Sequence, residues 1–270
     1  LAVVLAGVGA WMLTPGRLTG LVNRELSRRL NADVTAHNVR LDLFSTYPIA
    51  RVSIDSLTVA CRPDSVRTAD GKIMADARQL LRTGAVTARM DIRKLLHKDI
   101  DLQYAGVDSM RLNLVRFSPA RSNWNILPAK IKPDKNLTFT FDTLRLAHGS
   151  VRFRDMVSDT DASLAINPEA SILPQGSGSY RSSIPAKASV SMKGRKYLTD
   201  LPLLLEGDTK LTFTSFALST EDFTVKLGDI TGLVTLDMNM NPEIRINAFD
   251  WKLSPCLLYT SPSPRDAHES

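Results

Sequence analysis

The sequence predicts a mainly β protein, in which an N-terminal membrane helix and a short amphipathic helix precede a long curled sheet. Two observations predict this class. From residue 39 onward, apolar residues recur at every second position, which is the period of strands with one apolar face. Before that point they recur at helical spacing, behind an apolar N-terminal segment. We expect mostly antiparallel pairing and an apolar groove along one side of the sheet.

Residues 1–13 carry no charged side chain. A helix of this length spans roughly 20 Å, whereas a bilayer core needs about 20 residues and 30 Å. The segment is therefore either the end of a transmembrane helix or the apolar core of a cleaved signal peptide. Trp11 suits the membrane interface, and we take residues 1–13 as a truncated transmembrane anchor.

Residues 256–270 resemble a translated sequencing adapter, beginning with the run from Cys256 to Asp266. The alternative is a disordered tail rich in Ser and Pro. We leave these residues out of the fold prediction and expect the natural chain to continue past Pro255. The folded region is then residues 14–255, incomplete at its C-terminus. Its single cysteine, Cys61, cannot form an internal disulfide or build a zinc site.

The charge of the chain argues against nucleic-acid binding. The formal net charge of +6 is modest, and the basic residues form no cluster beyond the first helix. Aromatic residues, which would stack on bases, make up only 6% of the chain. The same charge is compatible with work beside anionic lipid.

One amphipathic helix is predicted over residues 16–31. Arg17, Arg24 and Arg28 lie away from its apolar side, and Arg29 stands next to them. Two compatible roles stay open: a cap over the end of the sheet, and an interfacial helix on the bilayer. The apolar side consists of Leu18, Leu21, Val22, Leu26 and Leu30.

A long series of strands follows residue 31, with two interruptions. The polar residues 62–79 predict a loop or a short helix, and residues 167–187, rich in Pro, Gly and Ser, predict the main loop. A change of phase after Ile54 indicates a β-bulge. The alternating runs occupy residues 39–43, 52–59, 86–92, 100–104, 110–114, 139–153, 188–192, 211–213, 223–227, 234–240 and 244–251.

Alternation of this extent gives the sheet one apolar and one polar face. A single sheet cannot leave such an apolar face in water. It must close on itself, pack against a second layer or hold an apolar ligand, and the pattern leaves all three open. In its clearest stretch, Val86, Ala88, Met90 and Ile92 alternate with Thr87, Arg89 and Asp91.

Three local patterns follow one another through the first part of the chain. The first, residues 44–59, places an aromatic residue and a proline before an alternating run. The second starts with the strand at 86–92, passes a turn and a second strand, and ends in residues 121–125. The third, residues 144–155, has the form of a hairpin with Gly149 at its turn.

In this order, after an apolar N-terminus, the three patterns resemble the AsmA family, envelope proteins anchored in the bacterial inner membrane with a β-rich region in the periplasm. The resemblance covers roughly residues 10–160, and residues 188–253 agree in strand pattern only. Ala120 stands where the family usually has Gly.

The resemblance implies a function that the residues alone do not show. AsmA-like proteins are related to bridge-like lipid-transfer proteins, whose apolar grooves are thought to carry phospholipid between the inner and outer membranes. It implies a single-pass inner-membrane protein, mostly in the periplasm, that supports outer-membrane assembly without catalysis or a cofactor. The candidate lipid-facing residues are Val86, Ala88, Met90 and Ile92, and the candidate membrane-surface residues are Arg17, Arg24, Arg28 and Arg29.

A second class of function stays open. The chain would then be a structural or regulatory envelope protein, whose sheet packs dry and which acts through protein partners. The two classes differ in whether the side chains of residues 86–92 touch lipid or other side chains.

No catalytic residue and no metal site is predicted. The three histidines lack the spacing of paired ligands, and four aspartates stand at strand spacing, which favours a solvated face over acid–base chemistry. These residues are His37, His97 and His148, and Asp91, Asp99, Asp101 and Asp108.

Residues 123–125 allow two interpretations. Asn123, Trp124 and Asn125 either form a binding site or close one end of the sheet, with the indole as a plug and the amides bonded to turn backbone.

Overall fold

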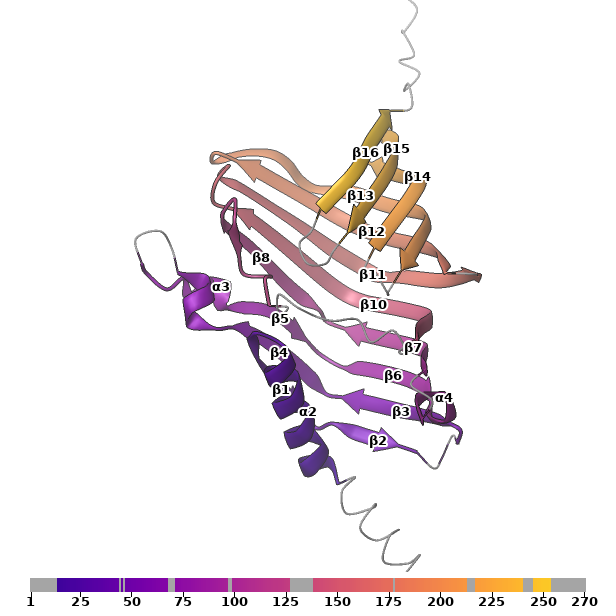
Figure 1. The fold of residues 1–270 in the computed structure, drawn as a ribbon. Coiled ribbons are helices and arrows are strands. Elements are labelled where there is room, and N and C mark those ends of the chain that lie inside the picture. Colours follow the sequence, from indigo (N-terminus) through magenta and orange to yellow (C-terminus); the bar gives the residue numbers. More distant parts are fainter. Residues whose placement is uncertain are drawn as a thin grey trace, which may run out of the picture.

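The structure is a computed structural model that describes residues 14–253, except for residues 44, 46, 68–70, 97–98, 127–137, 177, 213–216 and 240–244. All sixteen strands in this part of the chain belong to one mixed sheet, with β1 at one edge and β16 at the other (Figure 1). The mainly β class and the predominance of antiparallel pairs are confirmed. The two edges do not meet, so the sheet is open.

The helices are few and short. The predicted amphipathic helix is confirmed as α2 (Pro15–Arg29). The segment 62–79, predicted as a loop or short helix, holds the 3-10 helix η1 (Pro63–Val66) and the α-helix α3 (Ala75–Arg78). A further short helix, α4 (Ile92–Leu96), follows the sixth strand.

The first eight strands are the halves of four long strands. The two halves of each long strand are separated by only one or two residues. Within this region, where one half of a long strand pairs with a half of the next long strand, its other half pairs with that strand's other half. The chain therefore runs back and forth as a meander of four bent strands. The paired halves are β1 (Ala32–His37) and β2 (Arg40–Asp42), β3 (Ile49–Ile54) and β4 (Ser56–Cys61), β5 (Gln79–Thr83) and β6 (Val86–Asp91), and β7 (Asp99–Asp108) and β8 (Arg111–Ser118).

The interruptions lie side by side and form a crease across the sheet. The backbone N–H of Asp55 donates to the carbonyl of His37 at 3.1 Å, so the breaks in neighbouring strands are adjacent. Residues in the left-handed backbone region bend the strands here. The change of phase predicted after Ile54 falls on this crease. Positive φ angles occur at Asn38 (49°), Ser109 (54°) and His148 (50°).

The second half of the sheet is built on one long strand, β10 (Thr138–Asp155). It runs parallel to β7 and β8, and these are the only parallel pairs among the described strands. An antiparallel meander continues from its other side. The remaining strands are β9 (Arg121–Ser122), β11 (Thr160–Gly176), β12 (Ser179–Met192), β13 (Arg195–Thr212), β14 (Ala217–Leu227), β15 (Ile230–Asn239) and β16 (Arg245–Leu253).

The hairpin expected over residues 144–155 is not present. These residues form one continuous part of β10, paired with β11 throughout. His148, with a φ of 50°, is a single bulged residue at the crease rather than a turn. The sequence alone does not distinguish a hairpin turn from a bulge, because both favour a glycine next to a residue with positive φ.

The main loop expected over residues 167–187 is also wrong. The segment lies in β11 and β12, which pair antiparallel. Pro168 is tolerated because it falls within a register shift between Ile166 and Ser171, where the ladder takes no N–H from it.

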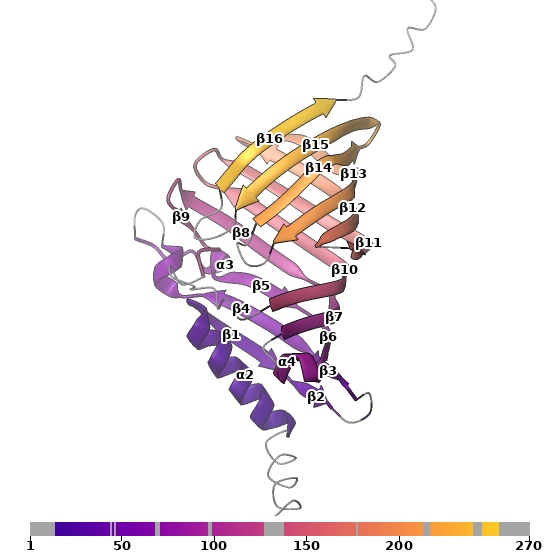
Figure 2. The ribbon, with the colours of Figure 1, turned by 45° about the vertical axis from the view of Figure 1, so that its right-hand side comes forward.

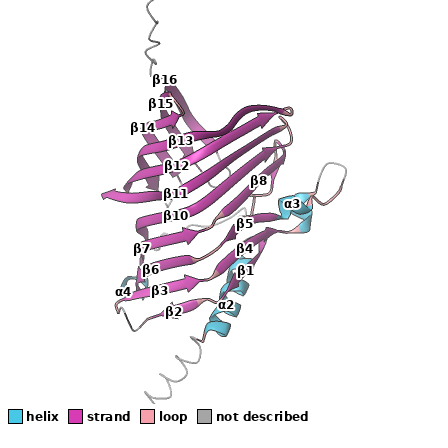
Figure 3. Cartoon of the chain, turned by 180° about the vertical axis from the view of Figure 1, so that it is seen from behind, coloured by secondary structure: helices cyan, strands magenta, loops and turns pink. Residues whose placement is uncertain are grey.

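The last three strands turn over the rest of the sheet. They cross in front of β11–β13 in Figure 1 and lie behind them in Figure 3. A register shift between Glu206 and Thr209 marks the start of this turn. Gly207 lies within it at a φ of +156°, and a Cβ there would stand 2.8 Å from the ring of Phe223. Only glycine fits this close approach.

The two edges differ in their surroundings. Figure 2 shows α2 running along the edge formed by β1, whereas β16 forms the opposite edge, far from any described helix.

Candidate functional site

The register aligns apolar side chains into one continuous face, which we call the apolar face. Leu146 and Leu164 pack against the same buried cluster, so the side chains on both sides of the crease share this face. On the β2 side of the crease, one row of directly paired residues runs across the strands: Ile54, Val86, Val107, Leu146 and Ala170. On the β1 side of the crease, a second row of directly paired residues runs across the strands: Val34, Val59, Leu81, Leu112, Val151, Leu164, Ala188 and Leu201.

Three of the four candidate lipid-facing residues lie on the apolar face. Val86, Ala88 and Met90 stand opposite apolar residues of β3, each of them half-buried. Arg89 lies on the opposite, polar face, where its guanidinium is 4.6 Å from the centroid of the Tyr104 ring. The alternation predicted for this strand is therefore present from residue 86 to residue 90.

Ile92 does not belong to that strand. β6 ends at Asp91, and Ile92 is the first residue of α4. Its backbone N–H still donates to the carbonyl of Pro48 at 3.1 Å, and from there the chain leaves the sheet as α4. The expectation that Ile92 continues the apolar alternation of the strand is therefore corrected.

One end of the apolar face is covered. There α2, α3 and residues 122–126 pack over β1, β4, β5 and β8. The Cys61 thiol lies in this covered end and donates to the Asn123 carbonyl at 3.0 Å, and burial raises the pKa of the thiol to about 11. The buried residues are Ala32, Val34, Val59, Cys61, Val66, Ala77, Leu80 and Val115.

The rest of the apolar face is much less covered. The described helices make their main contacts with β1–β8, not with β10–β16. The buried cluster in the second half consists of Ile166, Ala170 and Ala186 alone. Large side chains around it, such as Leu146 and Leu203, are only half-buried. Apolar surface thus remains in contact with solvent across several adjacent strands.

Helix α2 caps the β1 edge of the sheet. Thr19, Asn23 and Ser27 stand four residues apart on one side of the helix and bond the outer backbone of the edge strand, in place of another strand. The predicted role as a cap is confirmed. The sequence signal that was missed is this stripe of small polar residues. Its bonds are Asn23 Nδ2 to Ala36 O (3.1 Å), Ala36 N to Asn23 Oδ1 (2.6 Å), Val34 N to Ser27 Oγ (2.9 Å) and Val39 N to Thr19 Oγ1 (2.9 Å).

The arginines of α2 lie on its exposed side. Arg17, Arg24 and Arg28 are all exposed, and Arg28 lies 3.6 Å from Glu25. The side chain of Arg29 lies outside the described residues. None of the described helices has the length and apolar character needed to cross a bilayer. The expected anchor, residues 1–13, also lies outside the described residues.

Asn123 and Trp124 close the covered end, which is one of their two predicted roles. Asn123 is 1% exposed, and its Oδ1 accepts the N–H of Val115 at 2.8 Å. Its Nδ2 donates to the carbonyls of Ala77 (3.0 Å) and Asn113 (2.8 Å). The Trp124 ring lies 6.1 Å from that of Phe153 and packs against the buried cluster. The amide thus ties α3 and β8 together.

Two of the aspartates expected on a solvated face are buried. Asp91 is 5% exposed, and its hydrogen bond with the Arg93 guanidinium lowers its pKa. Asp101 is 9% exposed and accepts a bond from Lys94 Nζ at 2.7 Å. The prediction fails here because α4 brings Arg93 and Lys94 back over the strands. Both carboxylates are held as ion pairs, which does not suit them for proton transfer.

The remaining titratable residues of the prediction do not form a site. His148 Nδ1 lies 3.0 Å from Asp108 Oδ1 at the crease, and this contact lowers the pKa of the exposed Asp108 carboxyl. His97 and the side chain of Asp99 lie outside the described residues. Within the described ranges, no three His, Cys, Asp or Glu side chains gather closely enough to hold a metal.

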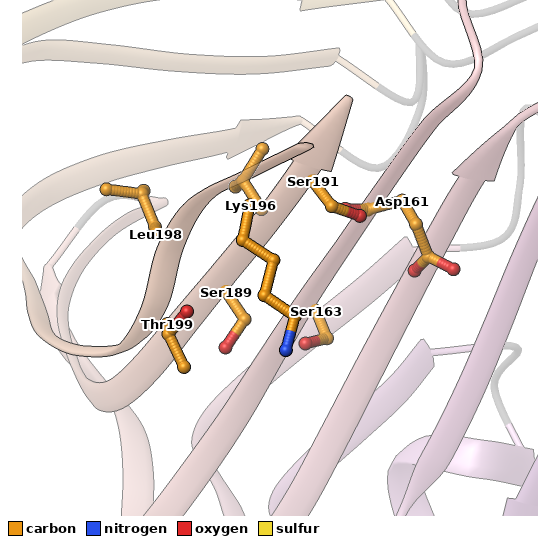
Figure 4. A pocket seen from close by; sticks show the side chains of 8 residues that line it. Asp161, Ser163, Ser189, Ser191, Lys196, Leu198 and Thr199 are labelled. Carbon is orange, nitrogen blue, oxygen red and sulfur yellow. The ribbon is translucent and has the colours of Figure 1, made fainter. Parts of the chain in front are cut away.

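A small hollow of about 180 Å³ opens on the polar face between β11, β12 and β13 (Figure 4). Lys196 extends across it toward the hydroxyl of Ser163. Asp161 at its rim is paired with Arg152, which lowers the pKa of the carboxyl. Ser189 bonds Asp200 at 3.2 Å. Its lining therefore combines serine and threonine hydroxyls with the Lys196 amine and a carboxylate that is already paired.

Comparisons with known proteins add no assignment. No protein-family model matches the chain, and a search of curated proteins found no match either. The resemblance to the AsmA family stays a prediction from the sequence patterns.

Proposed function

We propose that this chain is an AsmA-like envelope protein that holds or conducts phospholipid along the apolar face of its sheet. The observation that carries the proposal is the continuity of that face. Apolar side chains of β3, β6, β7 and β10 stand in register and remain half-buried. An acyl chain lying on them would be stabilised by about 0.8 kcal/mol for each CH₂ group removed from water.

The groove of this proposal lies on the side toward which β14–β16 turn. The same side carries α2, which stands in front of the sheet in Figure 1 and behind it in Figure 3. The apolar residues Val225 and Val234 continue the apolar face onto these last strands, since Leu205 pairs with Val225 and Phe223 with Val234. A polar headgroup would lie toward the open side, and no catalytic residue is required.

The proposal places the β1 end of the sheet at the bacterial inner membrane. Residues 1–13 would serve as a single-pass anchor, with the bulk of the chain in the periplasm. The arginines of α2 would contact anionic headgroups, at about 1 kcal/mol for each side chain near the surface. Because α2 is bonded to β1, the sheet would be held in a fixed orientation above the bilayer.

A second candidate function is favoured by the other edge. Phe249, Trp251 and Leu253 of β16 are 60%, 41% and 61% exposed. An edge strand with exposed apolar side chains is suited to pair with a strand of a partner. The chain would then be a structural or regulatory envelope protein that acts through protein partners.

Photo-crosslinking at two adjacent residues tests the proposal. A photoreactive amino acid is placed at Met90, on the apolar face, or at Arg89, on the polar face, and each protein is irradiated in membranes. We expect phospholipid adducts by mass spectrometry at residue 90 and few at residue 89. The two sites share a strand and differ only in face, so each controls for the other.

Two results would overturn lipid binding on this face. Equal lipid labelling at residues 89 and 90 would mean that the sheet merely lies close to a membrane. Protein crosslinks alone at residue 90 would mean that the apolar face packs against a partner, which supports the second candidate.

A further inference from the structure

A hollow of about 490 Å³ opens where β8 ends, and we call it the Trp124 hollow. It lies between the end of β8 and the turn that leads into β9. Charged, hydroxyl, amide and aromatic side chains line it together. Its principal lining residues are Arg116, Ser118, Arg121, Ser122, Trp124 and Asn125.

The Trp124 hollow carries positive charge. Arg116 pairs with Asp155, its partner in the ladder, with Nε 2.9 Å from Oδ1, so these two charges offset each other. Arg121 donates from Nη2 to the carbonyl oxygen of Arg67 at 2.8 Å, an uncharged acceptor. Within the described chain no carboxylate is paired with Arg121, so its charge is not offset.

One wall of the hollow continues the apolar face. The Trp124 ring lies 6.1 Å from the ring of Phe153, which stands in register with Leu114. An amphiphile lying on the apolar face would therefore meet Trp124 first and the charged and hydroxyl groups next. This order, apolar then cationic, matches the order of groups in a phospholipid from chain to headgroup.

The turn that forms the hollow is held in place. The buried amide of Asn123 makes three bonds to backbone groups of Val115, Ala77 and Asn113. Arg121 and Trp124 flank this residue within two positions, so the groups that face a ligand need little ordering on binding.

We propose that the Trp124 hollow binds the anionic phosphate of an amphiphile whose chains lie on the apolar face. Arg121 supplies the charge-assisted hydrogen bond, and the hydroxyls of Ser118 and Ser122 add neutral donors. The proposal rests on the proposed lipid function and deepens it by naming the headgroup chemistry. Free phosphate shares that chemistry, so the test separates the two sources.

The test is a titration of the whole chain with dihexanoyl phosphatidic acid below its micellar concentration. The indole N–H signal of Trp124, assigned with W124F, is followed by NMR. We expect saturable shifts in the wild type and about tenfold weaker binding in Arg121→Gln, which removes one charged donor. Arg121→Lys keeps the charge and should keep most of the affinity.

Arg111→Gln is the matched control. Arg111 lies on β8, the strand that pairs with β9, is exposed and is not part of the hollow, and its loss changes the net charge equally. Equal weakening by R121Q and R111Q, or no Trp124 shift at all, would overturn the site. Thermal unfolding of R121Q checks that the turn remains folded.

Inorganic phosphate and dihexanoylglycerol are titrated separately, as ligands that carry only the anionic group or only the chains. The proposal predicts that each alone binds at least about tenfold more weakly than the complete amphiphile, because each lacks half of the contacts. Phosphate binding as tight as phosphatidic acid would make this an anion site without a lipid. The crosslinking experiment at residue 90 is independent of this titration. A negative result for the Trp124 hollow would therefore leave the proposal of lipid binding on the apolar face intact.

Discussion

The two ends of this sheet differ in how their exposed groups are satisfied. At the first, the outer backbone of β1 is bonded by side chains of α2, and the apolar face beneath is sealed by Asn123 and Trp124. At the second, the outer edge of β16 has no partner in the described chain, and Phe249 is 60% exposed. The larger buried cluster thus lies at one end, and the strand edge without a described partner lies at the other.

The difference shows how an open sheet can remain folded. One well-packed end holds the meander together, and the later strands are added to it one by one through backbone bonds. The apolar face between the ends is only half-buried, and the proposed lipid function needs such a surface.

The largest expected effect is at the sealed end. Asn123→Ala leaves the Val115 N–H and two buried carbonyls without a partner, and should lower the free energy of unfolding by about 3–4 kcal/mol. Urea unfolding measures it. Asn247→Ala, in β16, is the control and should change the free energy by less than about 0.5 kcal/mol. Similar losses in both variants would contradict the contrast between the two ends.

The buried thiol of Cys61 adds a dependence on pH. In the unfolded chain a cysteine ionises near pH 9, whereas here the pKa is raised to about 11. The stabilisation from the protonated thiol is complete below pH 9 and should fall by about 2–3 kcal/mol as pH rises to 11. Urea unfolding of wild type and Cys61→Ala across this range measures it. A difference between the two proteins that is independent of pH would refute the effect.

Removing the helix cap should have a smaller effect. Asn23→Ala deletes both bonds to Ala36 and should lower the free energy of unfolding by about 1–2 kcal/mol. Hydrogen exchange provides the specific readout, since the Ala36 amide should lose protection. Arg24→Ala, on the exposed side of the same helix, should leave that amide protected. Unchanged exchange at Ala36 in the Asn23 variant would show that α2 does not cap the edge.

The smallest effect on stability is expected at the open end. Phe249→Ser should change the free energy of unfolding by about 0.5 kcal/mol or less, because the ring is 60% exposed. It should, however, reduce self-association at high protein concentration, measured by sedimentation velocity. Met192→Ser, 39% exposed on β12 and paired on both sides, with Thr160 and Arg195, serves as the comparison. Equal effects of the two substitutions would mean that the β16 edge has no special tendency to associate.

Local alternation predicted much of the fold. Val86, Ala88 and Met90 could be placed on one face from the sequence, because the period of two is set by neighbouring residues. The cap role of α2 was also accessible, since Leu26 and Leu30 needed a surface to cover. The Thr19, Asn23 and Ser27 stripe was missed because small polar residues on a helix ordinarily face water.

Long-range pairing set the limits of prediction. Nothing near β10 in the sequence indicates that it runs parallel to β7 and β8, since those strands lie about 40 residues earlier. Asp91 and Asp101 were expected in solvent because the return of Arg93 over the sheet depends on α4. The Trp124 hollow needs Arg116 and Arg121 to meet across a turn, which spacing alone does not reveal.

The antiparallel meander from β10 to β16 also bears on how such a chain can evolve. Each hairpin in it is bonded only to its neighbours. A duplicated hairpin could therefore be accepted near β16 without disturbing Asn123 or the helix at the far end. Each duplication would lengthen the sheet by about 10 Å, the width of two strands. The length of the sheet could thus change during evolution in steps of one hairpin, while the packed cluster at the β1 end stays the same.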